Sequence, residues 1–298
     1  MVGDNMKKIA IVILNYLNYW DTIECVESAL RIDYKDKEIV IVDNGSSNES
    51  FERLNKEFKS NHHIFILQSK KNVGFAKGNN IGIKFSRCQL KADYILVVNN
   101  DVVFRDWTIL KKMINHDRSN IGIIGCDILL SNGFIQKPYK VYLGFPEILY
   151  KYIVYIFKTY PLICNFFWNK LDKKNQEEVL HGCILFFTPS FFKYYKGFYP
   201  KTFLYCEEEI LKLMCKMYGL KQKKLHSTYI YHKEDQSSLE SWGNDEKVKG
   251  KYSVNSYKYV IWWRIKFEIK SKIKKSLIYI HKFITFMIKR KEVLQKFL

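Results

Sequence analysis

The sequence lacks the patterns that would place many proteins in a class at once. Its seven cysteines contain no C-x-x-C pair, which argues against a zinc site and a disulfide framework and fits a reducing, cytoplasmic setting. Neither a Walker A sequence nor a G-x-G-x-x-G turn is present. No apolar run reaches the roughly 18 residues of a membrane span, and the run at 9–14 is too short for a secretory signal. These absences predict a cytoplasmic protein that is soluble or lies peripherally on a membrane.

Composition and charge narrow the class further. The chain has 298 residues, 47% of them hydrophobic, which is enough for one large domain with an appendage. A net charge of +19 implies an anionic partner, such as nucleic acid, a lipid surface or a phosphorylated small molecule. The excess is local: residues 1–100 hold 14 Lys/Arg against 12 Asp/Glu, whereas residues 251–298 hold 13 against 2. We therefore predict one large domain over 1–250 and a basic C-terminal segment over 251–298.

Buried strands are expected at 8–14, 37–42 and 94–98, with helical patterns between them. This alternation predicts an α/β fold with a mostly parallel sheet and crossover helices. The strands end in Asn15, in Asp43 and in the run Asn99-Asn100-Asp101, and such strand ends share the edge where open α/β sheets bind ligands. Two of these polar ends also have a purely structural interpretation. The residues from Asp43 onward are typical of a helix N-cap, and the run Asn99-Asn100-Asp101 is typical of a turn after a strand.

A glycine-rich segment at residues 72–82 has glycines at 74, 78 and 82. Glycines four residues apart either let a helix face approach a neighbour closely or let backbone amides approach a phosphate. The glycine spacing alone does not distinguish these two interpretations. The position of the segment, between the strand ends at Asp43 and at Asn99-Asn100-Asp101, favours a role in ligand binding.

Three motifs in this order resemble the signatures of family 2 glycosyltransferases, the large GT-A group, and in particular its rhamnosyltransferase-like bacterial branch. They are Val-Asp-Asn-Gly-Ser-Ser at 42–47, Asn-x-Gly-Phe-Ala-x-Gly-Asn-Asn-x-Gly at 72–82 and Leu-x-x-Asn-x-Asp at 96–101. The resemblance covers about residues 8–240. It implies a GT-A fold and a nucleotide-sugar donor.

The resemblance also implies which residues bind the nucleotide. The first strand end and the Asp-Asn-Gly-Ser loop would hold it, and a carboxylate at position 43 suits the N3–H of uracil or thymine. The residues expected to bind the nucleotide are Asn15, Asp43, Asn72, Gly74, Asn80 and Asn99.

The segment Asn99-Asn100-Asp101 matches the D-x-D position of the family, where a carboxylate meets the Mg²⁺ or Mn²⁺ that bridges the diphosphate. Asn99 replaces the first aspartate, which leaves Asp101 as the one charged ligand of the motif. His232 ends an expected strand at 227–232, shortly before Ser237 and Ser238. It resembles a contributor to the metal or diphosphate site, and the alternative is a structural histidine.

Residues 197–211 resemble the family block that carries the catalytic base. The match places Glu207 and Glu208 on its Glu-Asp pair, with Glu208 as the base. Two departures leave the choice between these glutamates open, because Glu208 replaces an aspartate and Ile210 replaces a second one. Consecutive glutamates are also typical of a helix start, where the macrodipole favours acidic side chains.

The C-terminal segment has an apolar stripe at helical spacing, surrounded by basic side chains. The stripe consists of Ile265, Ile269, Ile273, Leu277, Ile280, Ile284 and Ile288. Either the helix packs against the catalytic domain or it lies on an anionic membrane, an option that Trp262 and Trp263 favour. The aromatic segment 139–168 has the same two interpretations.

These observations predict an inverting, metal-dependent transfer of a hexosyl or rhamnosyl group from a UDP- or dTDP-sugar. The acceptor would be a hydroxyl of a glycan or lipid-linked glycan in bacterial surface polysaccharide synthesis, at the inner face of the cell membrane. One alternative is a basic nucleic-acid-binding protein, but no nucleic-acid motif is present and the charge is concentrated in one segment. The other is an inactive family member that serves as an assembly partner.

Overall fold

The structure is a computed structural model that describes residues 7–143, 176–233 and 251–274. Strands and helices alternate through the first half of the chain, as predicted. The N-terminal half contains β1 (Ile9–Asn15), α1 (Tyr19–Leu30), β2 (Lys37–Asp43), α2 (Ser50–Phe58), β3 (Ile64–Gln68), α3 (Phe75–Cys88), β4 (Tyr94–Asn99), β5 (Val102–Phe104) and α4 (Ile109–Asn115). The remainder contains β6 (Ile121–Leu130), β7 (Tyr139–Tyr142), β8 (Gln176–Val179), β9 (Ile184–Phe187), α7 (Pro189–Phe192), α8 (Glu207–Met217), β10 (Lys221–His232) and a helix over 251–274.

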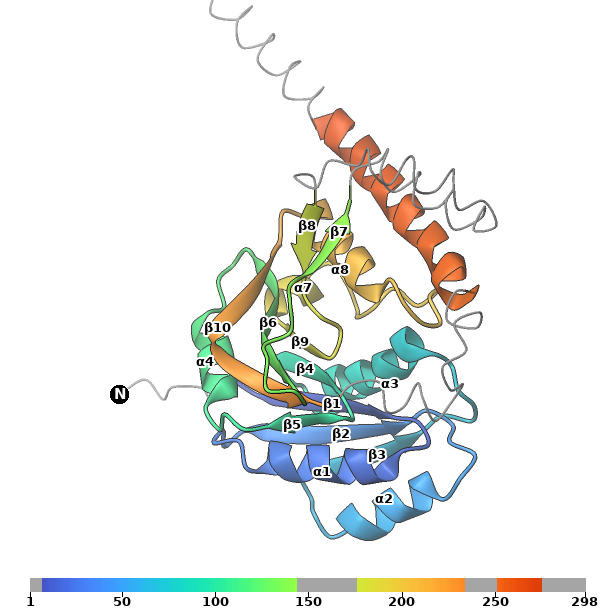
Figure 1. Ribbon diagram of the computed structural model, residues 1–298, viewed down its shortest axis with the longest axis vertical. Helices are drawn as coiled ribbons and strands as arrows, with labels where there is room; N and C mark the ends of the chain where they lie inside the picture. Colours follow the sequence, from blue (N-terminus) through green and yellow to red (C-terminus); the bar gives the residue numbers. More distant parts are fainter. Residues whose placement is uncertain (1–6, 144–175, 234–250, 275–298) are drawn as a thin grey trace, which may run out of the picture.

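The main sheet of the described chain has eight strands in the order β3-β2-β1-β4-β9-β6-β10-β5. Strands β1 to β4 run parallel to one another, and β6 runs parallel to β10. Strand β9 is antiparallel to both β4 and β6, so it joins the two parallel parts. Helices α1 and α2 cover one face of the sheet and α3 covers the other (Figure 1). This is the GT-A α/β arrangement that the sequence predicted.

Strand β1 is buried on both faces, which explains its almost purely apolar sequence. Ile9, Ile11 and Ile13 point into the core beneath α1 and α2, and Ala10 and Val12 point into the core on the α3 side. Because β1 pairs with both β2 and β4, its carboxyl end lies beside theirs. Asn15 pairs with Asp43, and Leu14 pairs with Asn99. The three polar strand ends therefore meet at one edge, as predicted.

Helix α3 carries two of the three glycines of the glycine-rich segment, and they bring it close to the sheet. A Cβ atom at Gly78 would lie 2.6 Å from Leu14 Cδ1, and one at Gly82 would lie 2.4 Å from Val12 Cγ1. Both distances are too short for two carbon atoms in contact. Close packing of the helix, the first of the two interpretations, accounts for these two glycines.

Replacing Gly82 with alanine is expected to destabilise the protein. The added methyl group overpacks the contact with Val12 and Val42, which typically costs about 1–3 kcal/mol, and the better helix propensity of alanine returns at most about 1 kcal/mol. The midpoint of urea unfolding should fall, whereas Lys84→Ala on the exposed side of the same helix should leave it nearly unchanged. An unchanged midpoint for Gly82→Ala would contradict this account of the helix packing.

Several predicted boundaries were wrong in the second half of the chain. Strand β10 begins at Lys221 rather than 227, because its lysine-rich start pairs with β6 and Lys224 forms an ion pair with Asp127 at 3.0 Å. The apolar run at 181–187 also predicts a strand, and strand β9 begins within it, at Ile184. Of the aromatic segment 139–168, the first residues form β7, which pairs with β8, and residues 144–168 lie outside the described residues. Ser237 and Ser238 lie outside them as well.

The helix over 251–274 has two different faces. Tyr257, Val260 and Trp263 are buried and belong to the same core as α3 and α8. The opposite face is open to solvent: Ile265, Ile269 and Ile273 are 39%, 53% and 56% exposed. The helix therefore packs against the catalytic domain while its isoleucine stripe remains uncovered. No helix in the described ranges is both long and apolar enough to cross a membrane.

Candidate active site

Asn15 and Asp43 lie side by side at the ends of β1 and β2, and both are completely buried. The Asn15 side-chain amide donates to Asp43 Oδ1 at 2.8 Å, and Ser46 Oγ donates to the same oxygen at 2.6 Å. The other oxygen, Asp43 Oδ2, accepts from Ser46 N at 3.2 Å. Asp43 thus orders its own loop and does not cap a helix, since α2 begins at Ser50 after Glu49. The N-cap interpretation was wrong, and a nucleotide contact by Asp43 remains a prediction.

The loop before α3 lies against the Asp43 loop. Asn44 donates to Asn72 Oδ1 at 3.0 Å and accepts from Val73 N, and Gly74 N donates to Asn72 Oδ1 at 2.9 Å. Gly74 has a φ of +87°, and a Cβ atom there would lie 2.4 Å from Phe203 O, so only glycine suits the position. Asn72 and Gly74 are therefore joined to the Asp43 loop, as expected of one binding surface.

Asn80 lies apart from this loop cluster. Its amide donates to Phe198 O at 2.9 Å and its Oδ1 accepts from Phe198 N at 2.8 Å. The side chain therefore anchors the segment 197–198 to α3. Its expected role in nucleotide binding stays a prediction.

The three residues after β4 have different environments. Asn99 is partly exposed at the end of the strand. Asn100 is buried and donates to Asn18 O at 3.1 Å and to Thr22 Oγ1 at 3.2 Å, so it joins the strand end to α1. Asp101 is 3% exposed, and its backbone oxygen accepts from Lys233 N at 3.1 Å. This last contact fixes the end of β10 beside the D-x-D position.

Asp101 and His232 face each other, as the metal hypothesis requires. Asp101 Oδ1 and His232 Nε2 lie 3.2 Å apart, and neither atom has a well-formed hydrogen bond although both are buried. A carboxylate oxygen and an imidazole nitrogen directed at one point fit a divalent cation whose remaining ligands come from a diphosphate or water. Within the described ranges, no group of three or more His, Cys, Asp or Glu side chains could enclose a metal alone. Asp101 and His232 are therefore candidate metal ligands, and a cation held by them would need further ligands from outside this group of side chains.

The three glutamates at the start of α8 are not equivalent. Glu207 and Glu209 are 6% and 2% exposed, whereas Glu208 is half-buried. Glu208 Oε1 accepts from Gly182 N at 3.1 Å, and a Cβ atom at position 182 would lie 2.6 Å from that oxygen. Glu209 Oε1 accepts from the Tyr139 hydroxyl at 3.0 Å. Glu208 is therefore the least buried of these three side chains.

The surroundings of Glu208 also suit a base. Burial, with a smaller contribution from the nearby charge of Glu209, raises the pKa of Glu208 to about 7. Burial also raises the pKa of Glu207 well above its ordinary value. A carboxylate with a pKa near the working pH is a stronger base than an ordinary glutamate and is still ionised in a large part of the molecules.

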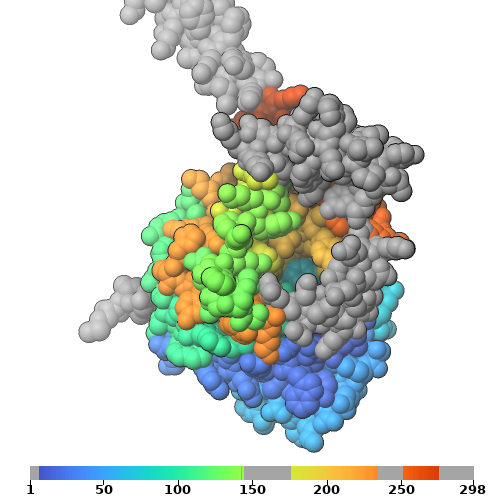
Figure 2. Space-filling view, in the orientation of Figure 1, coloured from blue at the N-terminus to red at the C-terminus, as the bar shows by residue number. Residues whose placement is uncertain are grey.

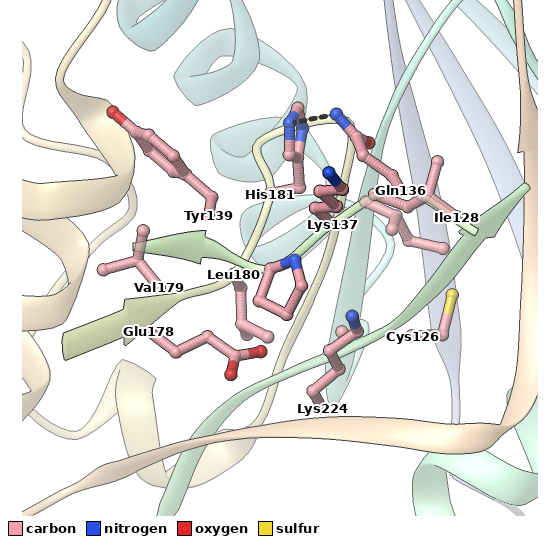
Figure 3. A pocket seen from close by; sticks show the side chains of 13 residues that line it. Cys126, Ile128, Gln136, Lys137, Tyr139, Glu178, Val179, Leu180, His181 and Lys224 are labelled. Atoms are coloured by element: carbon pink, nitrogen blue, oxygen red, sulfur yellow. Dashed lines mark hydrogen bonds between the residues drawn. The ribbon is translucent and has the colours of Figure 1, made fainter. Parts of the chain in front are cut away.

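A pocket beside Glu208 contains residues that the sequence did not single out. It is a small, partly open pocket between β6, β8 and β10, and Gln136 Nε2 and His181 Nε2 lie 2.8 Å apart in it (Figure 3). Its polar and aromatic lining includes Gln136, Lys137, Tyr139, Glu178, His181 and Lys224.

His181 joins this pocket to the rest of the site. Its ring centroid lies 6.4 Å from that of His232, and the next residue, Gly182, binds Glu208. In the space-filling view, the surface is hollowed near the centre of this face, between the green segment and the gold segment that contains α8 (Figure 2). The sequence signal for His181 was the run 181–187, which resembles the family strand that precedes the acceptor site. No comparable signal marks Gln136.

The polar strand ends at one edge of the sheet, the facing pair Asp101 and His232 and the glutamates at the start of α8 together form the candidate active site. The sequence profile of glycosyl transferase family 2 matches residues 10–196, which is more than half of the chain. The chain belongs to this family. The family prediction is thereby confirmed.

Relatives and solved structures agree with this assignment. The low-salt glycan biosynthesis hexosyltransferase Agl10 of Haloferax volcanii is 30% identical over 125 residues, which are 42% of this chain and 38% of that protein. The mannosyltransferase PcManGT of Pyrobaculum calidifontis, solved with GDP-Man and Mn²⁺, has a TM-score of 0.54 at 10% identity over 92% of this chain and 76% of that one. S. aureus TarS 1-349 with UDP-GlcNAc has a TM-score of 0.50 at 15% identity over 77% and 59%. The chain spans less than half the length of the curated relatives it matches first.

Proposed function

We propose that this protein transfers a sugar from a nucleotide-diphosphate donor to a hydroxyl group of a glycan or lipid-linked glycan. The observation that carries the proposal is the placement of the Glu208 carboxylate on Gly182 N, directly after His181, whose ring centroid lies 6.4 Å from that of His232 beside Asp101. A base, a metal ligand pair and a place for the acceptor are the parts that a single displacement at an anomeric carbon needs.

In the proposed reaction, Glu208 removes the proton of the acceptor hydroxyl. The oxygen then forms a bond to the anomeric carbon as the bond from that carbon to the diphosphate breaks, and the configuration inverts. Asp101 and His232 would hold Mg²⁺ or Mn²⁺, which when bound neutralises charge on the diphosphate. Gly182 N holds Glu208 in place through its hydrogen bond. Glu208, rather than Glu207, is proposed as the base because the Glu207 carboxyl is buried.

The donor is proposed to be a UDP- or dTDP-sugar bound at the loops of Asp43 and Asn72. This rests on the polar strand ends that meet there, and on solved structures of the same fold in complex with UDP-GlcNAc and GDP-Man. The direct test is a panel of UDP-, dTDP- and GDP-sugars, screened by calorimetry in the presence of Mn²⁺ and then for hydrolysis. Binding of none of them would refute the proposed function.

The acceptor is proposed to enter the pocket at His181. Gln136 Oε1 is buried there without a hydrogen-bond partner, which suits the hydroxyl group of a sugar. Tyr139 adds an aromatic face and Lys137 an exposed cation. A glycan in the synthesis of a bacterial surface polysaccharide fits this chemistry.

We further propose that the protein works at an anionic membrane surface, on which a lipid-linked acceptor would lie. The uncovered stripe of Ile265, Ile269 and Ile273 supports this, because it lies opposite the buried face of its helix. Lys266 and Lys272 on the same helix are exposed and can meet anionic head groups. This placement would bring the cytoplasmic protein to the inner face of the cell membrane.

Replacing Ile269 and Ile273 with aspartate is expected to release the protein from vesicles that contain phosphatidylglycerol. Each buried isoleucine contributes about 1.5–3 kcal/mol, and about 1.4 kcal/mol corresponds to a tenfold change in affinity, so binding should weaken about tenfold or more per site. Co-sedimentation measures this. Ile135→Asp, a change at an exposed isoleucine elsewhere, is the matched control. Equal binding of all variants would contradict the membrane proposal.

Point variants are preferable to truncation of the helix, because Tyr257 and Val260 belong to the core.

A further inference from the structure

The turn that precedes α8 has a costly backbone conformation. Tyr205 and Cys206 have φ values of 71° and 69°, in the left-handed region that side chains other than glycine rarely adopt. Glu207 and Glu208 follow directly. Such a conformation persists only where its surroundings hold it, and it is typical of functional sites. The direction of the first turn of α8, and with it the position of the Glu208 carboxylate, depends on what holds Tyr205 and Cys206.

One support comes from the donor side of the molecule. Phe75 N, at the start of α3, donates to Phe203 O at 2.8 Å. Gly74 packs directly against Phe203, which lies two residues before Tyr205. The beginning of the turn is therefore attached to the loop that contains Asn72.

The other support comes from the helix over 251–274. Ser256 is 2% exposed, and its hydroxyl donates to Leu204 O at 2.8 Å. The rings of Tyr252 and Phe203 stack with centroids 4.9 Å apart. Cys206 Sγ, also buried, contacts Ser253 O at 4.0 Å. Three contacts therefore join residues 252–256 of this helix to the segment 203–206.

We propose that Ser256 is a positioning residue for the base. Residues 252–256 of the C-terminal helix maintain the left-handed conformation of Tyr205 and Cys206, from which Glu208 projects. The catalytic part of this inference rests on the proposed role of Glu208. The helix then has two functions on its two faces: the outer face supplies the uncovered isoleucine stripe, and the inner face sets the geometry of the active site. Ser256 itself touches neither substrate nor metal in this scheme.

The test compares Ser256→Ala with Val260→Ala. Val260 is fully buried one helical turn further on and belongs to the core, so its truncation loosens the helix without removing the contact to Leu204. Ser256→Ala is expected to lower kcat for the nucleotide sugar that the panel identifies by about tenfold or more, with KM for the donor unchanged, because a small displacement of a base is costly. Val260→Ala should lower the melting temperature and change kcat by less than about twofold.

A second variant separates positioning from general loss of structure. Glycine adopts φ near +70° freely, so Cys206→Gly reduces the need for external support of the turn. In a double-mutant cycle, Ser256→Ala should therefore lower kcat less in the Cys206→Gly background than in the wild type. Additive effects of the two substitutions would overturn the proposal.

Amide hydrogen exchange gives a readout that does not depend on catalysis. In Ser256→Ala the peptide over 203–212 should exchange faster than in the wild type, and in Val260→Ala it should not. Unchanged exchange in Ser256→Ala overturns the inference even if the protein is a glycosyltransferase. Conversely, full turnover by Glu208→Gln refutes the proposed base, while faster exchange in Ser256→Ala would still establish the support of the turn.

Discussion

Glu208→Gln is expected to lower turnover by about 10²- to 10⁴-fold, the usual effect of removing a positioned general base. Glutamine keeps the size of the side chain and can still accept from Gly182 N, so the fold and donor binding should be preserved. Steady-state kinetics with calorimetric measurement of donor affinity checks both parts. Glu207→Gln is the matched control on the preceding residue. If Glu207→Gln is the crippled variant and Glu208→Gln is active, the base has been assigned to the wrong residue.

The same assignment predicts the pH profile. Burial raises the pKa of Glu208 to about 7, and the base acts only when ionised, so kcat should fall about tenfold per pH unit below that value. Glu209→Gln removes the nearby negative charge that helps to raise the pKa of Glu208, and the acid limb of the profile should move to lower pH. A profile that is flat between pH 5 and 8, with chemistry rate-limiting, would contradict the assignment.

The raised pKa also has a consequence for stability. Between the ordinary pKa of a glutamate and about 7, the folded protein binds the Glu208 proton and the unfolded chain releases it. The contribution of this group to the free energy of unfolding is therefore fully present at low pH and is lost as the pH rises through about 7. This direction is opposite to that of a salt-bridged carboxylate.

Asp101→Ala is expected to remove the effect of Mn²⁺ on donor binding. Substitutions around metal ligands typically cost about 10- to 100-fold in metal affinity, and loss of the one charged ligand after β4 should reach the upper end of that range. Calorimetry of a nucleotide diphosphate with and without Mn²⁺ measures this without requiring turnover. Asp33→Ala removes an exposed carboxylate that pairs with Lys111 at the surface and serves as the control. Undiminished Mn²⁺-dependent binding by folded Asp101→Ala would exclude the proposed metal site.

The parts of the fold that the sequence predicted best are those with a simple physical signature. Strands β1, β2 and β4 are apolar because both of their faces are buried, and their polar ends mark the ligand edge. The lysine-rich start of β10 has no such signature, since its pairing with β6 depends on contacts made only after folding. The same limit applies to the site. Gly182 and Gln136 acquire their roles from Glu208 and His181, which are distant in the sequence.

Residue identity alone also gave an incomplete account of several side chains. Asn80 belongs to a motif of the family, yet its amide is occupied by the backbone of Phe198. Trp262 and Trp263 are neighbours in sequence, but Trp263 is buried in the core and Trp262 is 39% exposed. Neighbouring residues on a helix point in different directions, so which of the two tryptophans faces the core is known only once the packing of the helix is known.

The antiparallel strand β9 has a consequence for how the chain folds. Strands β1 to β4 are formed by one continuous stretch of about the first hundred residues, so this half of the sheet closes through local connections. Its edge at β4 is completed only when Ile95 pairs with Phe187, which is synthesised much later. During translation, an emerging chain therefore exposes the apolar edge of β4 until β9 arrives, and such an unpaired edge favours association with other chains. Substitutions in β9 should for this reason reduce the yield of folded protein more than their effect on the stability of the finished protein would suggest.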